Sequence, residues 1–380
     1  MKLIVMLMAL VSAALLAQEP ETQPLFKAKT DGFELYRIPG MVVTAKGTVL
    51  VYCEARHDAK SDWGEIEVHL RRSTDGGKTF DKAHQIAHMG QRSEGNPHKK
   101  TGGEHEQTVN NPVAIADRDG IVHFLYQLNY ARSFYMRSDD DGVTWSRPVE
   151  ITAGFEGFRP RCDWKVQATG PGHGIQLRGG RLVSPIWLAY GKTGDHAPSM
   201  SGTIYSDDHG KTWKAGDIAV PNEGDYHNPN ESAVAELSDG KVMLISRNPS
   251  KPNRKLITVS ADGATGWSTP RFEEALWEPV CMSGLLALPK PAGTLLFSCP
   301  HNLKRDAEGK EIPGSNAPRR NLSIQVSRDD GHTWSTGKSL VEGASMYSDL
   351  AALPDGTILC FYEAGGNISL ARIAPGWLGL

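Results

Sequence analysis

Three arginines interrupt apolar, strand-like segments at distant places in the 380-residue chain. They are Arg37 in YRIPG, Arg247 in LISRNPS and Arg319 in APRRNLSIQVS. Each one alone is best explained by a salt bridge or by an extended side chain at the surface. Together they cannot neutralise one another, and their planar guanidinium groups suit a carboxylate. If the fold joins these segments, the sequence predicts a site for a carboxylate anion.

Three further side chains of suitable chemistry lie at the edges of strand-like runs. Asp62 is in the loop segment SDWG, Glu231 follows a proline-containing loop in NPNES, and Tyr347 precedes an apolar run in MYSDL. Acidic residues in loops are usually solvated, so Asp62 alone indicates nothing about function. These groups become candidates for acid and base chemistry only if the fold places them beside the arginines.

A repeated box indicates which elements would have to position these groups. The pattern S-x-D-x-G-x-T-[WF] begins at Ser73, Ser138, Ser206 and Ser327, and a decayed copy, SADGATGW, begins at Ser260. Asp and Gly favour a tight hairpin turn, and the Asp carboxylate can accept hydrogen bonds from nearby backbone N–H groups. The final aromatic residue is expected to pack beneath the sheet. Each box therefore predicts a hairpin.

A second motif, a glycine followed by alternating apolar residues, alternates with the first. Its copies, such as KGTVLVY and DGTILCFY, contain Gly47, Gly120, Gly180, Gly240, Gly293 and Gly356. About six alternations predict six similar antiparallel sheets, and radial repetition of such sheets gives a propeller. We therefore expect an all-β, six-bladed β-propeller of four-stranded antiparallel sheets. Two stacked β-sandwiches are the alternative, which the regular repeat disfavours.

Composition agrees with this fold class and excludes others. The chain has 41 basic and 44 acidic residues, so it lacks the excess of basic residues that would indicate binding to nucleic acid. Its 40 glycines and 23 prolines fit short strands with tight turns. The five cysteines form no CxxC pair, and Cys53, Cys299 and Cys360 lie in strand-like runs where buried thiols are expected. One disulfide remains possible; we expect no metal and no cofactor.

The first 17 residues are typical of a signal peptide. A lysine precedes an apolar run over residues 3–16, and Ala17 follows it. The run is short for a membrane span, although an uncleaved anchor is the alternative. We therefore predict a signal peptide over 1–17, a single domain over 18–380, and a secreted or periplasmic monomer without a later membrane span.

These motifs together resemble the exo-α-sialidase (neuraminidase) family of glycoside hydrolases. The similarity covers residues 31–365 and rests on YRIP, the boxes, NPNES followed by LISRN, RRNLSIQVSRDDGHTW and MYSDLAALPDG. It implies hydrolysis of terminal α-linked sialic acids from glycoproteins, glycolipids or oligosaccharides. Sialic acid carries a carboxylate on its anomeric carbon, which matches the carboxylate site predicted from the arginines.

The resemblance also implies which residues bind the substrate. Arg37, Arg247 and Arg319 match the arginine triad that holds the carboxylate, and Arg56 in CEAR matches a residue that contacts the sugar near C4. Arg320 adjoins Arg319 and is the alternative third member. Trp63 and Gln107 are weaker candidates for the pocket that holds the acyl group.

The catalytic residues follow from the same resemblance. Tyr347 matches the nucleophile, Glu231 its partner base, and Asp62 the general acid/base, with Asp58 as the alternative to Asp62. A carboxylate nucleophile would meet the substrate's own negative charge, whereas a tyrosine starts neutral. Sialidases are the established tyrosine exception among glycosidases, and the implied mechanism retains the anomeric configuration.

Two other functions are compatible with the fold. The first is hydrolysis of a related nonulosonic acid that lacks the N-acetyl group, a Kdn-like substrate. The second is a sialic-acid-binding lectin with an inactive site. The presence of Asp62, Glu231 and Tyr347 together disfavours the lectin, because binding requires only the arginines.

Overall fold

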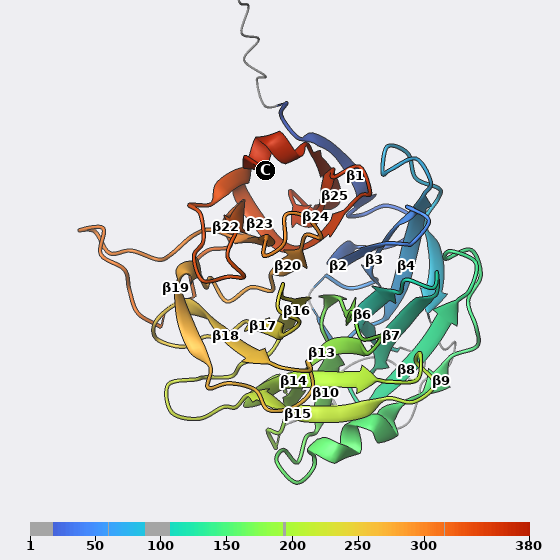
Figure 1. Ribbon diagram of the computed structural model, residues 1–380, viewed down its shortest axis with the longest axis horizontal. Coiled ribbons are helices and arrows are strands. Elements are labelled where there is room, and N and C mark those ends of the chain that lie inside the picture. Colours follow the sequence, from blue (N-terminus) through green and yellow to red (C-terminus); the bar gives the residue numbers. More distant parts are fainter. Residues whose placement is uncertain (1–17, 60, 88–106, 193–194, 315) are drawn as a thin grey trace, which may run out of the picture.

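The protein is a propeller-like arrangement of β-sheets around a common centre (Figure 1). The structure is a computed structural model that describes residues 18–59, 61–87, 107–192, 195–314 and 316–380. The only helices in these ranges are two short 3-10 helices, η1 (Thr152–Phe158) and η2 (Pro375–Leu378). The predicted all-β propeller class is therefore confirmed. The predicted signal peptide, 1–17, lies outside the described residues.

The first three sheets along the chain follow the predicted plan closely, with an added short strand in two of them. The sheet β2-β3-β4-β5 comprises β2 (Leu35–Val43), β3 (Val49–Arg56), β4 (Ile66–Ser73) and β5 (His84–Ala87). The sheet β11-β6-β7-β8-β9 comprises β6 (Val109–Ala116), β7 (Val122–Leu128), β8 (Arg132–Ser138), β9 (Val149–Glu150) and β11 (Gly172–His173), which pairs with β6 in parallel. The sheet β10-β13-β14-β15 comprises β10 (Val166–Thr169), β13 (Leu182–Ala189), β14 (Ser199–Ser206) and β15 (Lys214–Val220), with β12 (Ile175–Gln176) also paired to β13.

The two remaining sheets contain the C-terminal part of the chain. The sheet β16-β17-β18-β19 comprises β16 (Ser232–Glu236), β17 (Val242–Ser246), β18 (Arg254–Ser260) and β19 (Arg271–Trp277). The sheet β1-β25-β24-β23-β22-β21-β20 comprises β1 (Glu21–Lys27), β20 (Gly284–Ala287), β21 (Leu295–Pro300), β22 (Arg320–Ser327), β23 (Lys338–Ala352), β24 (Ile358–Ala364) and β25 (Asn367–Ile373).

The prediction of six separate four-stranded antiparallel sheets is wrong in this detail. The described strands form five hydrogen-bonded sheets, one of them seven-stranded. The reason is the 15-residue strand β23. Its first half pairs with β22, from Lys338 to Ala344, and its second half pairs with β24, from Ser345 to Ala352. One continuous strand thus joins two repeats that the turn motifs count separately.

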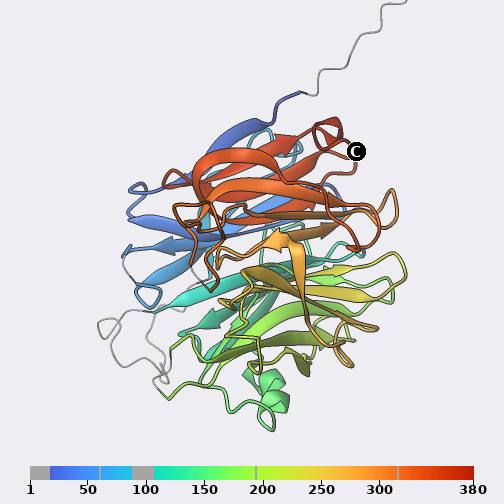
Figure 2. The ribbon, with the colours of Figure 1, turned by 90° about the vertical axis from the view of Figure 1, so that its left-hand side faces the viewer.

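The N-terminal strand completes the sheet at the C-terminal end of the chain. β1 pairs antiparallel with β25, from Glu21 opposite Arg372 to Lys27 opposite Asn367. Figures 1 and 2 show this strand, in blue, alongside the red C-terminal strands. The ends of the described chain are therefore held together by a backbone ladder.

Both repeated motifs form turns at the same end of the strands. The six motif glycines all have φ between 81° and 97°, a conformation that glycine adopts without steric cost. In the box at Ser206, the Asp208 carboxylate accepts hydrogen bonds from the hydroxyls of Ser206 and Thr212, at 2.8 and 2.6 Å. It also accepts from the Thr212 N–H at 2.9 Å. The predicted turn chemistry of the boxes is confirmed.

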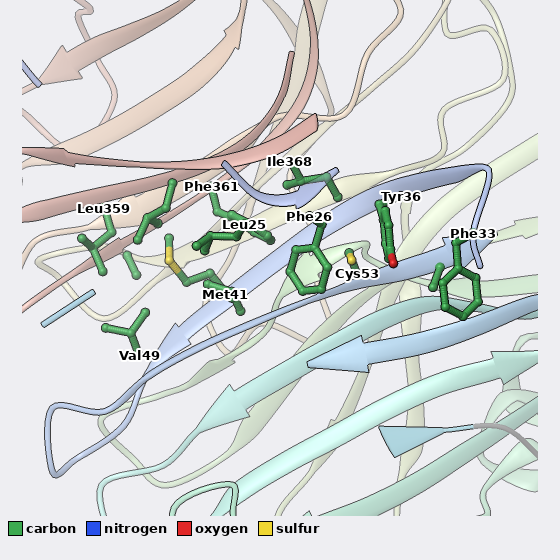
Figure 3. Close-up of a cluster of buried hydrophobic side chains, with 14 of the residues drawn as sticks. Leu25, Phe26, Phe33, Tyr36, Met41, Val49, Cys53, Leu359, Phe361 and Ile368 are labelled. Carbon is green, nitrogen blue, oxygen red and sulfur yellow. The ribbon is translucent and has the colours of Figure 1, made fainter. Parts of the chain in front are cut away.

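The hydrophobic core lies between neighbouring sheets. Figure 3 shows one cluster, in which Phe26 of β1, Cys53 of β3 and Phe361 of β24 pack between the first and last parts of the chain. The aromatic residues that end the boxes each pack against a different cluster: Phe80, Trp145, Trp213, Trp267 and Trp334. The five cysteines are buried free thiols. Within the described residues, no helix has the length and apolar character needed to cross a membrane.

Candidate active site

A cavity of about 160 Å³ lies at the end of the strands opposite the repeated turns. All seven predicted site residues line it: Arg37, Arg56, Asp62, Glu231, Arg247, Arg319 and Tyr347. The lining also includes six residues that were not predicted: Ile38, Asn111, Tyr130, Trp187, His196 and Asn230. The alternative residue Arg320 is exposed on β22 and does not line the cavity. Asp58 is also exposed and outside this lining.

The strand order explains how distant residues converge here. In an antiparallel sheet, the start of one strand and the end of the next lie at the same end. Arg37 is near the start of β2 and Arg56 ends β3, while Glu231 precedes β16 and Arg247 follows β17. The same alternation, repeated around the centre, brings Arg319 and Tyr347 from the seven-stranded sheet to this end.

Tyr347 is a buried hydroxyl group in the cavity with a carboxylate beside it. Its side chain is 4% exposed, and its hydroxyl donates a hydrogen bond to Glu231, with both carboxylate oxygens at 2.7 Å. Arg247 Nη1 donates to the same hydroxyl at 2.6 Å and also forms an ion pair with Glu231. Burial raises the pKa of Tyr347, although the Arg247 guanidinium opposes that rise. The phenol is therefore neutral and has a carboxylate positioned to take its proton.

The two other arginines of the predicted triad lie over the Tyr347 ring. The guanidinium carbons of Arg37 and Arg319 are 5.1 and 5.5 Å from the ring centroid. Arg37 Nε donates to Glu363 Oε1 at 2.9 Å, and Arg319 donates to the carbonyl of Val280. Burial alone would lower the pKa of Arg37, but the Glu363 carboxylate outweighs it and the pKa is raised. Three cations thus surround one phenol.

One residue beside each of these arginines has an unusual backbone conformation. Ile38, next to Arg37, has φ 64°, and Val280, the acceptor for Arg319, has φ 58°. Positive φ is rare for β-branched residues and costs about 1–3 kcal/mol at each site. Glu363 Oε1 accepts a hydrogen bond from the Ile38 N–H at 2.8 Å, which helps to hold the first of these conformations. Such strain concentrates at functional sites in proteins.

Arg56 forms hydrogen bonds with two carboxylates, the buried Glu54 and the half-exposed Asp62. Its Nε and Nη2 donate to Glu54 Oε2 at 2.9 and 2.6 Å, and its Nη1 donates to Asp62 Oδ1 at 2.5 Å. Glu54 is fully buried and also accepts from the Asn111 N–H at 2.8 Å. The Asp62 side chain is 49% exposed. Burial pushes its pKa up, but Arg56 outweighs burial and the pKa lies below its usual value.

Three aromatic rings that sequence reasoning missed form part of the cavity lining: Tyr130, Trp187 and His196. The His196 ring centroid lies 5.1 Å from that of Tyr130 and 5.3 Å from that of Trp187. Trp63 packs behind these rings, 4.5 Å from the Tyr130 centroid, and neither Trp63 nor the buried Gln107 lines the cavity. Single aromatic residues in strands look like core positions in a sequence, so no pattern singled these out.

Among the residues that the structure describes, none of the cavity side chains belongs to a cluster with the spacing of a metal site. Among the described residues, one such cluster exists, formed by Asp117, Asp119 and His209. None of the three lines the cavity.

Known proteins support the family assignment. A family model described as a BNR repeat-like domain matches residues 93–360. The sialidase of Micromonospora viridifaciens is 31% identical over 374 residues, which cover 92% of this chain and 53% of that protein. The sialidase of Bacteroides fragilis (strain YCH46) is 30% identical over 361 residues, which cover 89% and 61%. The chain thus spans less than two thirds of the length of these relatives.

A solved structure agrees with the sequence relatives. The Hadza microbial sialidase Hz136 superposes with a TM-score of 0.75 at 27% identity, covering 93% of this chain and 69% of that one. The resemblance to sialidases drawn from the motifs is confirmed. The chain belongs to the BNR repeat-like domain family and, within it, is a relative of the sialidases.

Proposed function

We propose that this protein is an exo-α-sialidase that hydrolyses terminal α-linked sialic acids of glycoproteins, glycolipids or oligosaccharides. The observation that carries the proposal is the contact between the Tyr347 hydroxyl and Glu231, beneath the guanidinium groups of Arg37 and Arg319. The names of the relatives, all sialidases, support it.

The arginines bind and orient the substrate. The carboxylate on the anomeric carbon binds Arg37, Arg247 and Arg319, whose positive charges face the same cavity. Charge-assisted hydrogen bonds of this kind are roughly twice as strong as neutral ones. Because the carboxylate is attached to the reacting carbon, fixing it also fixes that carbon above the Tyr347 oxygen, which lowers the entropic cost of the attack.

Tyr347 then acts as the nucleophile and Glu231 as its base. The Tyr347 oxygen forms a bond to the anomeric carbon while its proton passes to Glu231, 2.7 Å away. The bond from the anomeric carbon to the leaving oxygen breaks, and Asp62 supplies the proton to that oxygen. The neutral phenol avoids the repulsion that a carboxylate nucleophile would have with the substrate carboxylate.

Asp62 must be protonated for this first step, and Arg56 opposes that. A substrate that binds Arg56 draws that cation away from Asp62 and brings a negative carboxylate nearby. Both changes raise the pKa of Asp62 and favour the acid form. In the second step Asp62 takes a proton from water, the water oxygen replaces Tyr347 on the anomeric carbon, and Glu231 returns the proton to Tyr347. Two displacements give retention.

The same proposal extends to the organisation of the protein. If the two halves of β23 are counted in separate blades, the seven-stranded sheet supplies two blades and the propeller has six. We propose that these blades form one domain over 18–380, that residues 1–17 are a signal peptide, and that the protein is secreted or periplasmic. We further propose that it acts as a monomer without cofactor or metal.

The test is release of a fluorophore from an aryl α-sialoside by the purified protein. We expect turnover by the parent, loss of at least about a thousandfold in kcat for Tyr347→Phe, and no loss for Tyr205→Phe on β14. Absence of turnover with retained binding of sialic acid would instead favour the lectin. Turnover only of the substrate that lacks the N-acetyl group would assign the related nonulosonic acid.

A further inference from the structure

A fully buried ion pair lies outside the cavity of the candidate active site. Lys255, on β18, and Glu278, just after β19, have completely buried side chains, and Lys255 Nζ lies 2.8 Å from Glu278 Oε2. Neither residue lines the cavity. Burying two charges is costly unless further hydrogen bonds satisfy them, so the other contacts of this pair indicate what it holds in place.

The pair holds both backbone polar groups of Cys281, in the loop between β19 and β20. Glu278 Oε1 accepts a hydrogen bond from the Cys281 N–H at 2.9 Å, and Lys255 Nζ donates to the Cys281 carbonyl at 2.5 Å. Glu278 Oε2 also accepts from the Asn248 N–H at 3.1 Å, so both oxygens of the carboxylate are fixed. The loop is therefore anchored on both sides of Val280, by Glu278 and by Cys281.

Val280 is the residue that holds Arg319. Its carbonyl accepts a hydrogen bond from Arg319 Nη2 at 2.5 Å, and its φ is 58°. A β-branched residue keeps a positive φ only where the surrounding structure imposes it. The other two arginines of the triad each form an ion pair with a carboxylate, whereas Arg319 forms none with the residues that the structure describes. The position of the Val280 carbonyl therefore determines where the Arg319 guanidinium lies.

We propose that Lys255 and Glu278 are positioning residues that fix the Val280 carbonyl and, through it, the guanidinium of Arg319. This inference rests on the proposed sialidase activity, in which Arg319 binds the carboxylate of the substrate. Neither side chain of the pair touches the substrate. Without the pair the loop relaxes, Val280 leaves its positive φ, and its carbonyl turns away from Arg319.

The first measurement uses Glu278→Gln, which keeps the size of the side chain but leaves Lys255 without a counter-charge. The matched control is Asp117→Asn, the same change in the buried pair of Asp117 with His123, beside the motif turn at Gly120 and outside the cavity lining. Below the Tm of every variant, we expect Glu278→Gln to lower kcat/KM for the aryl α-sialoside at least about tenfold, because a small displacement of a binding group has that effect. Asp117→Asn should lower Tm but change kcat/KM less than about twofold. Equal losses of kcat/KM in the two variants would overturn the proposal.

The second measurement separates positioning from a general structural role. In an Arg319→Ala background the guanidinium that the pair holds is absent, so Glu278→Gln should lower kcat/KM there less than about threefold. An equal fold loss in both backgrounds would overturn the positioning role. If Glu278→Gln does not fold, Lys255→Met together with Glu278→Met replaces it in the same comparison, because removal of both charges of a buried pair is often tolerated. Absence of turnover by the parent would instead overturn the sialidase proposal, on which this inference rests.

Discussion

One end of the strands is repetitive and the other is irregular. At the first end, every motif glycine has a positive φ, and each complete box repeats the same contacts among serine, aspartate and threonine. At the second end no motif repeats, and the arginines, Glu231 and Tyr347 converge on one cavity. Both ends are built by the same strands, so the same scaffold supports both.

This contrast separates residues that maintain the fold from residues proposed to act on substrate. A box is stabilised by local contacts, since its hydrogen bonds lie within eight residues of the chain. The cavity depends on contacts over long distances, such as Tyr347 with Glu231 and Arg37 with Glu363. Changes at the irregular end should therefore affect activity, and changes at the repetitive end should affect stability.

The sharpest comparison uses two glutamates at opposite ends of one strand. Glu231 precedes β16 and Glu236 ends it, where it pairs with the exposed Arg178. Removing the proposed base should reduce kcat by about 10²–10⁴-fold, because general base catalysis is worth that much. We expect this loss for Glu231→Gln in the aryl sialoside assay and less than a twofold change for Glu236→Gln. Equal losses in the two variants would contradict the assignment.

The next comparison uses two adjacent arginines. Arg319 lines the cavity, whereas Arg320 is exposed on β22. Arg319→Lys keeps the charge but loses the planar fork, so roughly a 10- to 100-fold loss of kcat/KM is expected from one weakened charged hydrogen bond. Arg320→Lys should leave kcat and KM unchanged. Measurement of kcat and KM for both variants decides which arginine contacts the substrate.

The sequence predicted the site residues that lie in distinctive motifs and missed those that do not. Arg37, Glu231 and Tyr347 lie in motifs with a distinctive order, so the resemblance located them. The sequence assigned no site role to Trp187 or His196, and their place beside the cavity depends on how neighbouring sheets pack.

For the fold, the sequence predicted the local turns but not the way in which the strands join into sheets. Local turn chemistry identified the six glycine turns and the boxes, since these depend on a few adjacent residues. It did not reveal that β23 continues without a break from one repeat into the next, because both halves have ordinary strand sequences. The positive φ of Ile38 and Val280 was also invisible, since only the contacts of the folded chain hold such conformations.

A smaller effect is expected from Glu54, which touches Arg56 but does not line the cavity. Its carboxylate neutralises part of the Arg56 charge. In Glu54→Gln that charge acts on Asp62 with less compensation, so the already lowered pKa of Asp62 should fall further. The proposed acid then loses its proton at lower pH.

The alkaline limb of the kcat/KM profile should therefore move to lower pH. A purely structural role for Glu54 predicts a lower Tm with the limb unmoved. The pH profile of the variant, measured beside its thermal unfolding, separates the two outcomes.

The smallest effect on activity is expected at the repetitive end. Asp208→Ala removes the acceptor of three hydrogen bonds in its box, whereas Asp207→Ala removes only an exposed ion pair with Arg181. We expect Asp208→Ala to lower Tm by a few degrees, Asp207→Ala to change it less, and both to retain parental kcat.

The pH dependence identifies the cause of that stability loss. Hydrogen bonds from Thr212 lower the pKa of Asp208 to about 2, below that of an unfolded aspartate. A carboxyl group with a depressed pKa stabilises the fold above the unfolded pKa, and this contribution disappears as the pH falls toward the folded pKa. The Tm difference between parent and Asp208→Ala should therefore be constant above about pH 5 and shrink between about pH 4 and 2. A difference that persisted at pH 2 would show that packing, and not the charged hydrogen bonds, makes the box stable.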